Sequence, residues 1–232
     1  EEVGFDTRES VEDIARIMAG YHGVLAARVF SHSVVERMAA VSSVPVINML
    51  SDMSHPLQAL ADILTMEEHC GPINDLTVAW IGDYNNVARS LAEACALEGM
   101  HLRLASPRGY GASDNELARI AALGAASVEA FDEAQAAAVD AHAVHTDVFV
   151  SMGQEADTEQ RLKDFTEFQV NESMMAVADR SAIFMHCLPA HPGEEVEQAV
   201  LDNPRSIIFD QAENRLHTQK AIMAVLAKAA RK

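Results

Sequence analysis

Polar side chains gather at the ends of four predicted strands. The residue types are a thiol, carboxylates, amides and a guanidinium, carried by Asp83, Asn86, Asp147, Ser151, Cys187 and Arg215. In an open parallel sheet such strand ends lie at one edge, where the ligand binds. A carboxylate can hold an ammonium group, and amide or backbone groups can hold a carboxylate. These residue types therefore suit a zwitterionic amino acid.

A second group of residues suits an anion or a polarised carbonyl oxygen. His55 and Gln58 are three residues apart on one face of a helix whose first turn contains Pro56. The free backbone N–H groups and the dipole of a first turn favour negative charge. Arg28, at the end of an apolar stretch, adds a fixed positive charge. Together these residues indicate an acyl- or carbamoyl-phosphate subsite.

Each of these residues also has an ordinary structural explanation. A His–Pro pair at a helix start is often a cap, and Asn85-Asn86 suits a turn followed by a helix cap. A cysteine on a buried strand is usually a small core residue. Arg215 could be a solvated charge, and Asp147 could bond a neighbouring turn.

Two other site types find little support in the sequence. His186, Cys187 and His191 do not have a standard zinc-ligand spacing, so we expect no metal site. Residues 82–87 lack the second and third glycines of a dinucleotide-binding loop.

Stretches of strand and helix character alternate along the chain, which predicts an α/β fold with parallel sheets covered on both faces. Gly71-Pro72 marks a boundary. Strands are expected at 23–29, 44–48, 76–82, 101–105, 144–150 (with Asp147 inside), 183–188 and 206–210. Helices are expected at 10–21, 34–41, from 54 to at least 66, and at 85–99, 115–124, 131–139 and 218–230.

Composition excludes several functional classes. The chain has 232 residues, enough for one large or two small domains, and a formal net charge of −18. That charge argues against nucleic acid as a partner, because phosphate contacts need clustered Lys and Arg. No apolar run approaches the length of a membrane span. Three widely spaced cysteines indicate reduced thiols in a cytoplasmic protein.

Read together, the motifs resemble those of the aspartate/ornithine carbamoyltransferase family. His55-Pro-Leu-Gln58 is similar to the H-P-x-Q signature of the whole family. Asp147-Val-Phe-Val-Ser-Met-Gly153 and His186-Cys-Leu-Pro189 are similar to the D-x-x-x-S-M-G and H-C-L-P segments of its ornithine branch. Residues 80–86 and 209–215 resemble the W-x-G-D-x-N-N and E-N-R segments. The resemblance covers essentially the whole chain, in order.

The resemblance implies an enzyme that transfers the carbamoyl group of carbamoyl phosphate to the δ-amine of L-ornithine, with no metal or organic cofactor. It implies catalytic roles for Cys187, His55 and Arg215. The implied carbamoyl-phosphate ligands are Arg28, His55, Pro56, Leu57, Gln58, Cys187, Leu188 and Arg215. The implied ornithine ligands are Asn86, Asp147, Ser151 and Met152.

It also implies two Rossmann-like domains and a homotrimer. We expect a carbamoyl-phosphate domain at 1–70, an ornithine domain at 71–215, and a C-terminal helix at 216–232 that returns to the first domain. The family's S-x-R-T-R phosphate loop has no counterpart here, so we expect an incomplete first domain and little activity from these 232 residues alone. Each lost charge-assisted contact costs about 1.5–3 kcal/mol.

Two alternatives stay open. A non-catalytic descendant of the family could keep the amino-acid pocket without phosphate binding. A carbamoyltransferase could use another amine, such as putrescine or an acylated ornithine. Whether the reaction serves arginine synthesis or catabolism is also open.

Overall fold

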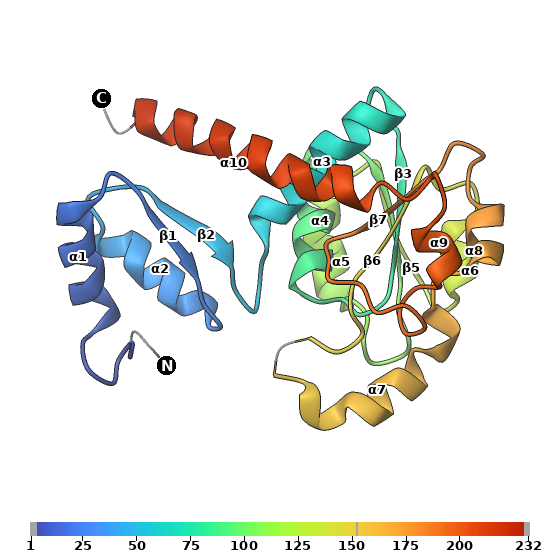
Figure 1. The fold of residues 1–232 in the computed structure, drawn as a ribbon, viewed down its shortest axis with the longest axis horizontal. Helices are drawn as coiled ribbons and strands as arrows, with labels where there is room; N and C mark the ends of the chain where they lie inside the picture. Colours follow the sequence, from blue (N-terminus) through green and yellow to red (C-terminus); the bar gives the residue numbers. More distant parts are fainter. Residues whose placement is uncertain (1–3, 152, 230–232) are drawn as a thin grey trace.

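The structure of the chain, a computed structural model, describes residues 4–151 and 153–229. It contains two α/β units that are linked by two long helices, α3 (Pro56–Cys70) and α10 (Ile208–Ala229) (Figure 1). Met152, which we expected in the site, lies outside the described residues. None of the helices described has the length and apolar character that crossing a membrane would need.

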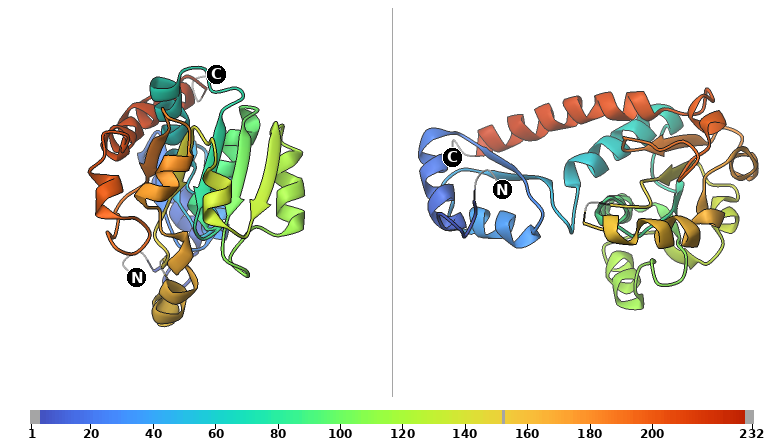
Figure 2. Two further views of the ribbon diagram at one scale, coloured as in Figure 1. Left: turned by 90° about the vertical axis from the view of Figure 1, so that its right-hand side faces the viewer. Right: turned by 60° about the horizontal axis from the view of Figure 1, so that its bottom comes forward.

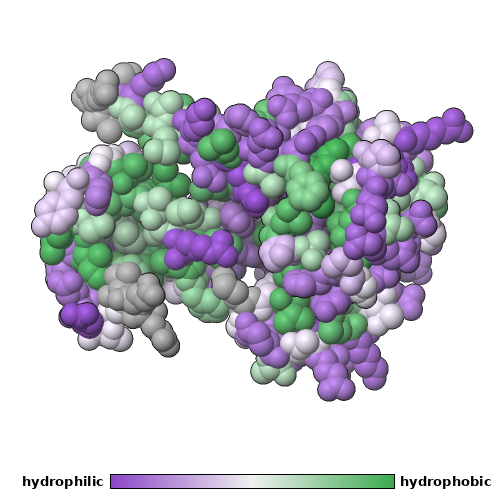
Figure 3. Space-filling model, in the orientation of Figure 1, coloured by the Kyte–Doolittle hydropathy of each residue, from purple (hydrophilic) through white to green (hydrophobic). Residues whose placement is uncertain are grey.

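The first unit is small. Its two strands are parallel and pair with Leu25 opposite Val46. Its elements are α1 (Val11–Tyr21), β1 (Leu25–Arg28), α2 (His32–Val41) and β2 (Val46–Leu50). The unit exposes several large apolar side chains, and apolar surface is prominent on its face in Figure 3. Its own core is modest, built around Val11, Ala15, Leu25, Val35 and Met38.

The second unit is built on a five-stranded parallel sheet with the order β5-β4-β3-β6-β7. The strands are β3 (Thr77–Ile81), β4 (His101–Ala105), β5 (Ser127–Phe131), β6 (Ala143–Thr146) and β7 (Ile183–His186). The helices are α4 (Asn86–Leu97), α5 (Asp114–Ala121), α6 (Ala134–Ala138), α7 (Thr158–Asp164), α8 (Glu172–Val177) and α9 (Gln198–Leu201). Two single 3-10 turns, Glu155–Asp157 and Thr166–Phe168, flank α7.

The central strands of the larger sheet are apolar on both sides, and a core cluster covers each face. In β3, Ile81 belongs to one core cluster with Phe149 and Phe184. Its neighbour Trp80 belongs to the opposite cluster, with Met185. Successive strand residues point to opposite faces, so this division is the expected one for a strand buried on both sides. The sheet ends that carry the polar residues are therefore held by two cores.

The helix α10 packs along α3 and extends from the second unit back over the first (Figure 2). Its inner face carries buried amides in place of a full apolar stripe. Gln211 Nε2 donates to Asp62 Oδ1 over 2.7 Å, and Asn214 Nδ2 donates to Thr65 Oγ1 over 2.9 Å. The helix beyond Thr218 is largely exposed in its own chain.

Three element predictions were wrong. No strand forms at 206–210, where only an isolated bridge joins Ser206 to Phe184 before α10 begins. β6 ends at Thr146, so Asp147 follows the strand and turns into the cleft. The stretch 131–139 is not one helix, because the edge strand β5 ends at Phe131 and α6 is a single short turn. We did not predict strand β5, because Glu129 and Ala130 are exposed at the edge of the sheet and give no strong apolar pattern.

Candidate active site between the two units

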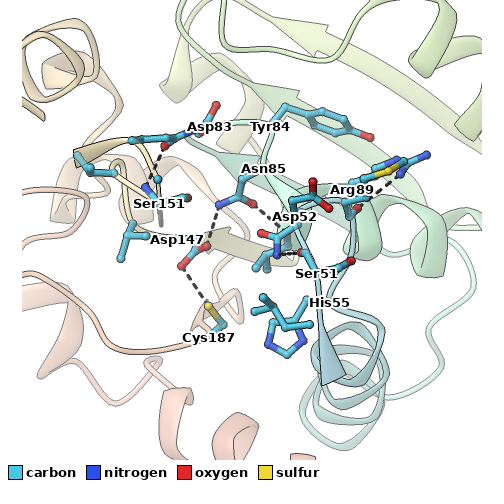
Figure 4. A pocket seen from close by; sticks show the side chains of 18 of the residues that line it. Ser51, Asp52, His55, Asp83, Tyr84, Asn85, Arg89, Asp147, Ser151 and Cys187 are labelled. Carbon is cyan, nitrogen blue, oxygen red and sulfur yellow. Dashed lines mark hydrogen bonds between the residues drawn. The ribbon is translucent and has the colours of Figure 1, made fainter. Parts of the chain in front are cut away.

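A cleft of about 910 Å³ lies where the two units face one another. Its walls come from the ends of β1 and β2, the ends of β3, β6 and β7, the start of α4, and α10. Figure 4 shows the residues that follow β2, β3, β6 and β7 around this cleft. Of the predicted site residues, it is lined by Arg28, His55, Asn86, Asp147, Ser151, Cys187, Leu188 and Arg215. The lining as a whole comes from seven separate stretches of sequence.

One wall is acidic and carries the thiol. Asp147 accepts a hydrogen bond from the Cys187 thiol on Oδ1 at 3.1 Å and another from Asn85 Nδ2 on Oδ2 at 2.8 Å. The thiol and the carboxylate are both buried. Burial, reinforced by the charge of Asp147, raises the pKa of Cys187 well above its usual value. Cys187 is therefore a protonated donor, and the wall offers a carboxylate to a cationic group.

A neighbouring part of the cleft carries imidazole and guanidinium groups. Arg215 Nη1 donates to Gln58 Oε1 and to the Cys187 carbonyl oxygen, each over 2.8 Å. Burial lowers the pKa of His55 to about 4; Asp62 opposes this shift, and Arg28 and Arg215 add to it. His55 Nδ1 is buried and has no hydrogen-bond partner among the described residues. A neutral imidazole next to fixed cations can bind a carbonyl oxygen that gains negative charge.

Three predicted residues lie behind this wall. Pro56 and Leu57 begin α3, and Leu57 and Gln58 are buried. Gln58 donates from Nε2 to Asp62 Oδ1 over 2.8 Å while its oxygen accepts from Arg215. In this geometry Gln58 supports Arg215 and does not itself line the cleft.

Two asparagines at the start of α4 bond to both units: Asn85 to Asp147 of the second unit and Asn86 to Ser51 of the first. Asn85 caps the helix by accepting from the Val87 and Ala88 backbone N–H groups. Asn86, which we expected at the ornithine, donates from Nδ2 to the Ser51 carbonyl oxygen over 2.7 Å. The sequence indicated only a capping role for Asn85, which also holds Asp147 through its side-chain amide.

Further lining residues had no sequence signal of their own. Ser51 and Asp52 follow β2, and Arg89 lies one turn into α4, where it bonds Glu116. Only the apolar strand ahead of Ser51 and the Asn–Asn turn ahead of Arg89 could have marked these positions.

The segment after β6 closes the lower rim of the cleft. The Ser151 N–H donates to Gln154 Oε1 over 2.9 Å. Gly153 has a φ of +86°, and a Cβ built on it would lie 3.4 Å from the Phe30 ring of the first unit. The buried Arg161 holds this segment from below, because it bonds both Asp83 and the Phe149 carbonyl oxygen. Arg161 thus holds the start of this rim at Phe149, and Gln154 holds Ser151.

The chain matches two profiles of one protein family. Residues 2–68 match the family's carbamoyl-P binding domain, and residues 74–226 match its Asp/Orn binding domain. The chain belongs to the aspartate/ornithine carbamoyltransferase family.

Relatives within the family are close in sequence and structure. An ornithine carbamoyltransferase of Halorhodospira halophila is 51% identical over 94% of this chain and 71% of its own length. One from Thermus thermophilus is 47% identical over 98% of this chain and 73% of its own length. The solved structure of ornithine carbamoyltransferase from Pyrococcus furiosus is similar with a TM-score of 0.90 and 44% identity, over 95% of this chain and 72% of that one. The two-unit α/β fold expected from the sequence is thereby confirmed.

Proposed function

We propose that the protein is an ornithine carbamoyltransferase, which transfers the carbamoyl group of carbamoyl phosphate to the δ-amine of L-ornithine and releases L-citrulline and phosphate. Identities near 50% to ornithine carbamoyltransferases over most of the chain support this reading. The observation that carries it is the division of one cleft into an acidic, thiol-bearing wall and a basic, imidazole-bearing wall.

The acidic wall is the proposed site of the amino acid. Asp147 would hold the α-ammonium group and Asn86 the α-carboxylate, and Ser151 and Met152 would belong to a loop that closes over the amino acid. Cys187 would lie next to the side-chain amine. The amine must be neutral to attack, and a buried protonated thiol does not stabilise an ammonium group beside it.

The basic wall is the proposed site of carbamoyl phosphate. Arg28 would bind the phosphate, and His55 and Arg215 would bind the carbamoyl oxygen. Pro56, Leu57 and Gln58 would shape that turn, and Leu188 would contribute its backbone carbonyl. Attack by the amine nitrogen forms a C–N bond and a tetrahedral oxyanion. Collapse then breaks the bond between carbon and the phosphate oxygen, so phosphate leaves with the electron pair and takes up the proton that the attacking nitrogen loses.

The predicted division into domains at 1–70, 71–215 and 216–232 is retained as part of this proposal, as are the homotrimer and the cytoplasmic location. Exposed apolar side chains on the first unit support assembly, since a surface of this kind is usually covered by a partner. Three free cysteines support a reducing compartment.

The test is citrulline formation by the natural protein that carries these residues. L-Ornithine should be carbamoylated much faster than L-aspartate, putrescine or N-acetyl-L-ornithine. Equal or better use of one of those three would replace the proposed acceptor. Binding of L-ornithine without citrulline formation would favour the non-catalytic alternative.

A further inference from the structure

His186 is completely buried between the sheet and the loop that follows β7, so it cannot touch a substrate. Both of its ring nitrogens are nevertheless engaged. Nδ1 lies 2.9 Å from the Leu188 backbone nitrogen, and Nε2 lies 3.1 Å from Glu195 Oε1. The Leu188 N–H can only donate, so Nδ1 must be the acceptor. The proton of the ring therefore sits on Nε2 and is donated to Glu195.

Glu195 is the other half of this arrangement. It is also completely buried, and its Oε1 accepts a second hydrogen bond from the His191 backbone N–H over 2.6 Å. The carboxylate thus joins the two ends of the loop 186–195 across its interior. A carboxylate that fixes the tautomer and orientation of a histidine is a general device of protein sites.

The pair of His186 and Glu195 holds the segment 187–189, which lines the cleft. Leu188 has a φ of +62°, a left-handed conformation that costs a residue with a side chain about 1–2 kcal/mol. The hydrogen bond from its N–H to His186 opposes that cost. The residue just before it, Cys187, donates from its thiol to Asp147 and accepts a hydrogen bond from Arg215 on its carbonyl oxygen. A shift of this turn would move all three contacts.

We propose that Glu195 and His186 are positioning residues: the carboxylate fixes the histidine tautomer, and the histidine holds Leu188 and Cys187 in the orientation that receives the side-chain amine of the substrate. This role rests on the proposed function, because it names the amine side of that site. It predicts an effect on the amino-acid substrate that exceeds any effect on carbamoyl phosphate.

Two pairs of substitutions separate hydrogen bonding from bulk. Glu195→Leu removes the acceptor, whereas Glu195→Gln keeps an oxygen for His186 and His191. His186→Leu removes the acceptor for the Leu188 N–H, whereas His186→Asn keeps an acceptor oxygen at the corresponding position of a shorter side chain. Glu194→Leu is the matched control for Glu195→Leu, because Glu194 is adjacent in sequence but exposed.

We expect Glu195→Leu and His186→Leu to raise KM for L-ornithine by about tenfold or more, and to raise KM for carbamoyl phosphate by clearly less. The Gln and Asn variants should lie much closer to the unaltered protein. An independent readout is the rate at which iodoacetamide alkylates Cys187, followed by mass spectrometry without substrates. That rate should rise in both Leu variants and not in Glu194→Leu.

Equal effects of the Leu and the amide variant at either position would overturn the proposal, as would equal increases in both KM values with unchanged alkylation of Cys187. If a Leu variant does not fold, Glu195→Gln and His186→Asn still test the proposal. In each, the alkylation rate of Cys187 and the KM for L-ornithine should stay near those of the unaltered protein, and a large change in either would contradict the proposal. If the unaltered protein forms no citrulline, the proposed function fails, while the alkylation comparison still reports whether the pair orients Cys187.

Discussion

The thiol of Cys187 donates a hydrogen bond to Asp147 Oδ1 over 3.1 Å, and both side chains are buried. Burial is the first cause of the raised pKa of this thiol, and the charge of Asp147 is the second. Asp147→Asn removes the charge and leaves the burial. We therefore expect the pKa of Cys187 to fall in this variant but to stay above the usual value.

Iodoacetamide alkylation measured against pH tests this expectation, because the thiolate is the reacting form. The substrate-free protein should be alkylated slowly at Cys187 near pH 8, and the Asp147→Asn variant severalfold faster. The midpoint of its profile should lie at lower pH. Cys70, far from the cleft and half-buried, serves as the internal reference. A faster reaction with an unchanged midpoint would mean that the substitution only opened the site.

The low pKa of His55, about 4 instead of 6.5, has two consequences. First, its imidazole signals in an NMR titration should move only below about pH 5. Second, the unfolded chain binds a proton at His55 between pH 6.5 and 4 while the folded protein does not. The free energy of unfolding should therefore rise with pH across this window and level off above 6.5.

His55→Gln should flatten that part of the stability profile, measured by urea unfolding at several pH values. His22 is exposed, so His22→Gln should leave the profile as it was. An NMR midpoint near 6.5 for His55 would contradict both statements, and with them the neutral imidazole of the proposed oxyanion site.

Gly153 and Gly71 offer a matched comparison for the rim of the cleft. Their φ angles are +86° and +83°, so alanine at either position costs about 1–2 kcal/mol of stability. Only Gly153 faces Phe30 across the cleft; Gly71 ends α3 in open space. Gly153→Ala should displace the Ser151 segment and raise KM for L-ornithine by about tenfold. Gly71→Ala should lower only the stability and leave KM unchanged. Equal KM values for L-ornithine in the two variants would show that the rim takes no part in binding it.

Local patterns predicted the elements with a strong apolar period. β4 forms at His101–Ala105 as expected, and α1 ends at Tyr21 as expected. Helix α10 shows why other helices and strands were predicted wrongly. A short apolar run at 206–209 suits a strand or a buried helix equally. The next turns bury Gln211 and Asn214 through hydrogen bonds to α3, so the apolar stripe that marks a helix is absent.

The site was predictable in residue type and only partly in arrangement. Motif spacing pointed to Asp147, Cys187 and Arg215, which the fold brings into one cleft. It could not separate Gln58 behind the wall from His55 on it, because burial depends on how α10 packs. Nor could it distinguish Glu195 from Glu194, since adjacent identical residues differ only in the direction that a folded loop gives them.

Arg161 offers a stability prediction for the support beneath the rim. Its guanidinium is buried against Tyr110 and Phe165 and bonds Asp83 and the Phe149 carbonyl oxygen. Arg161→Met leaves Asp83 as an unpaired buried carboxylate, which should lower the free energy of unfolding by about 3–5 kcal/mol. Adding Asp83→Asn should restore part of this loss, because the uncompensated charge is then gone.

Urea unfolding of the two variants, followed by the fluorescence of Trp80, measures these differences. The control is Arg108→Met: Arg108 pairs with Asp132, but its side chain is 89% exposed, so the cost should be at most about 1 kcal/mol. A similar small loss for Arg161→Met would show that water reaches Asp83 once the arginine is gone. The Ser151 segment would then owe its position to Gln154 and Phe30 instead of the buried pair.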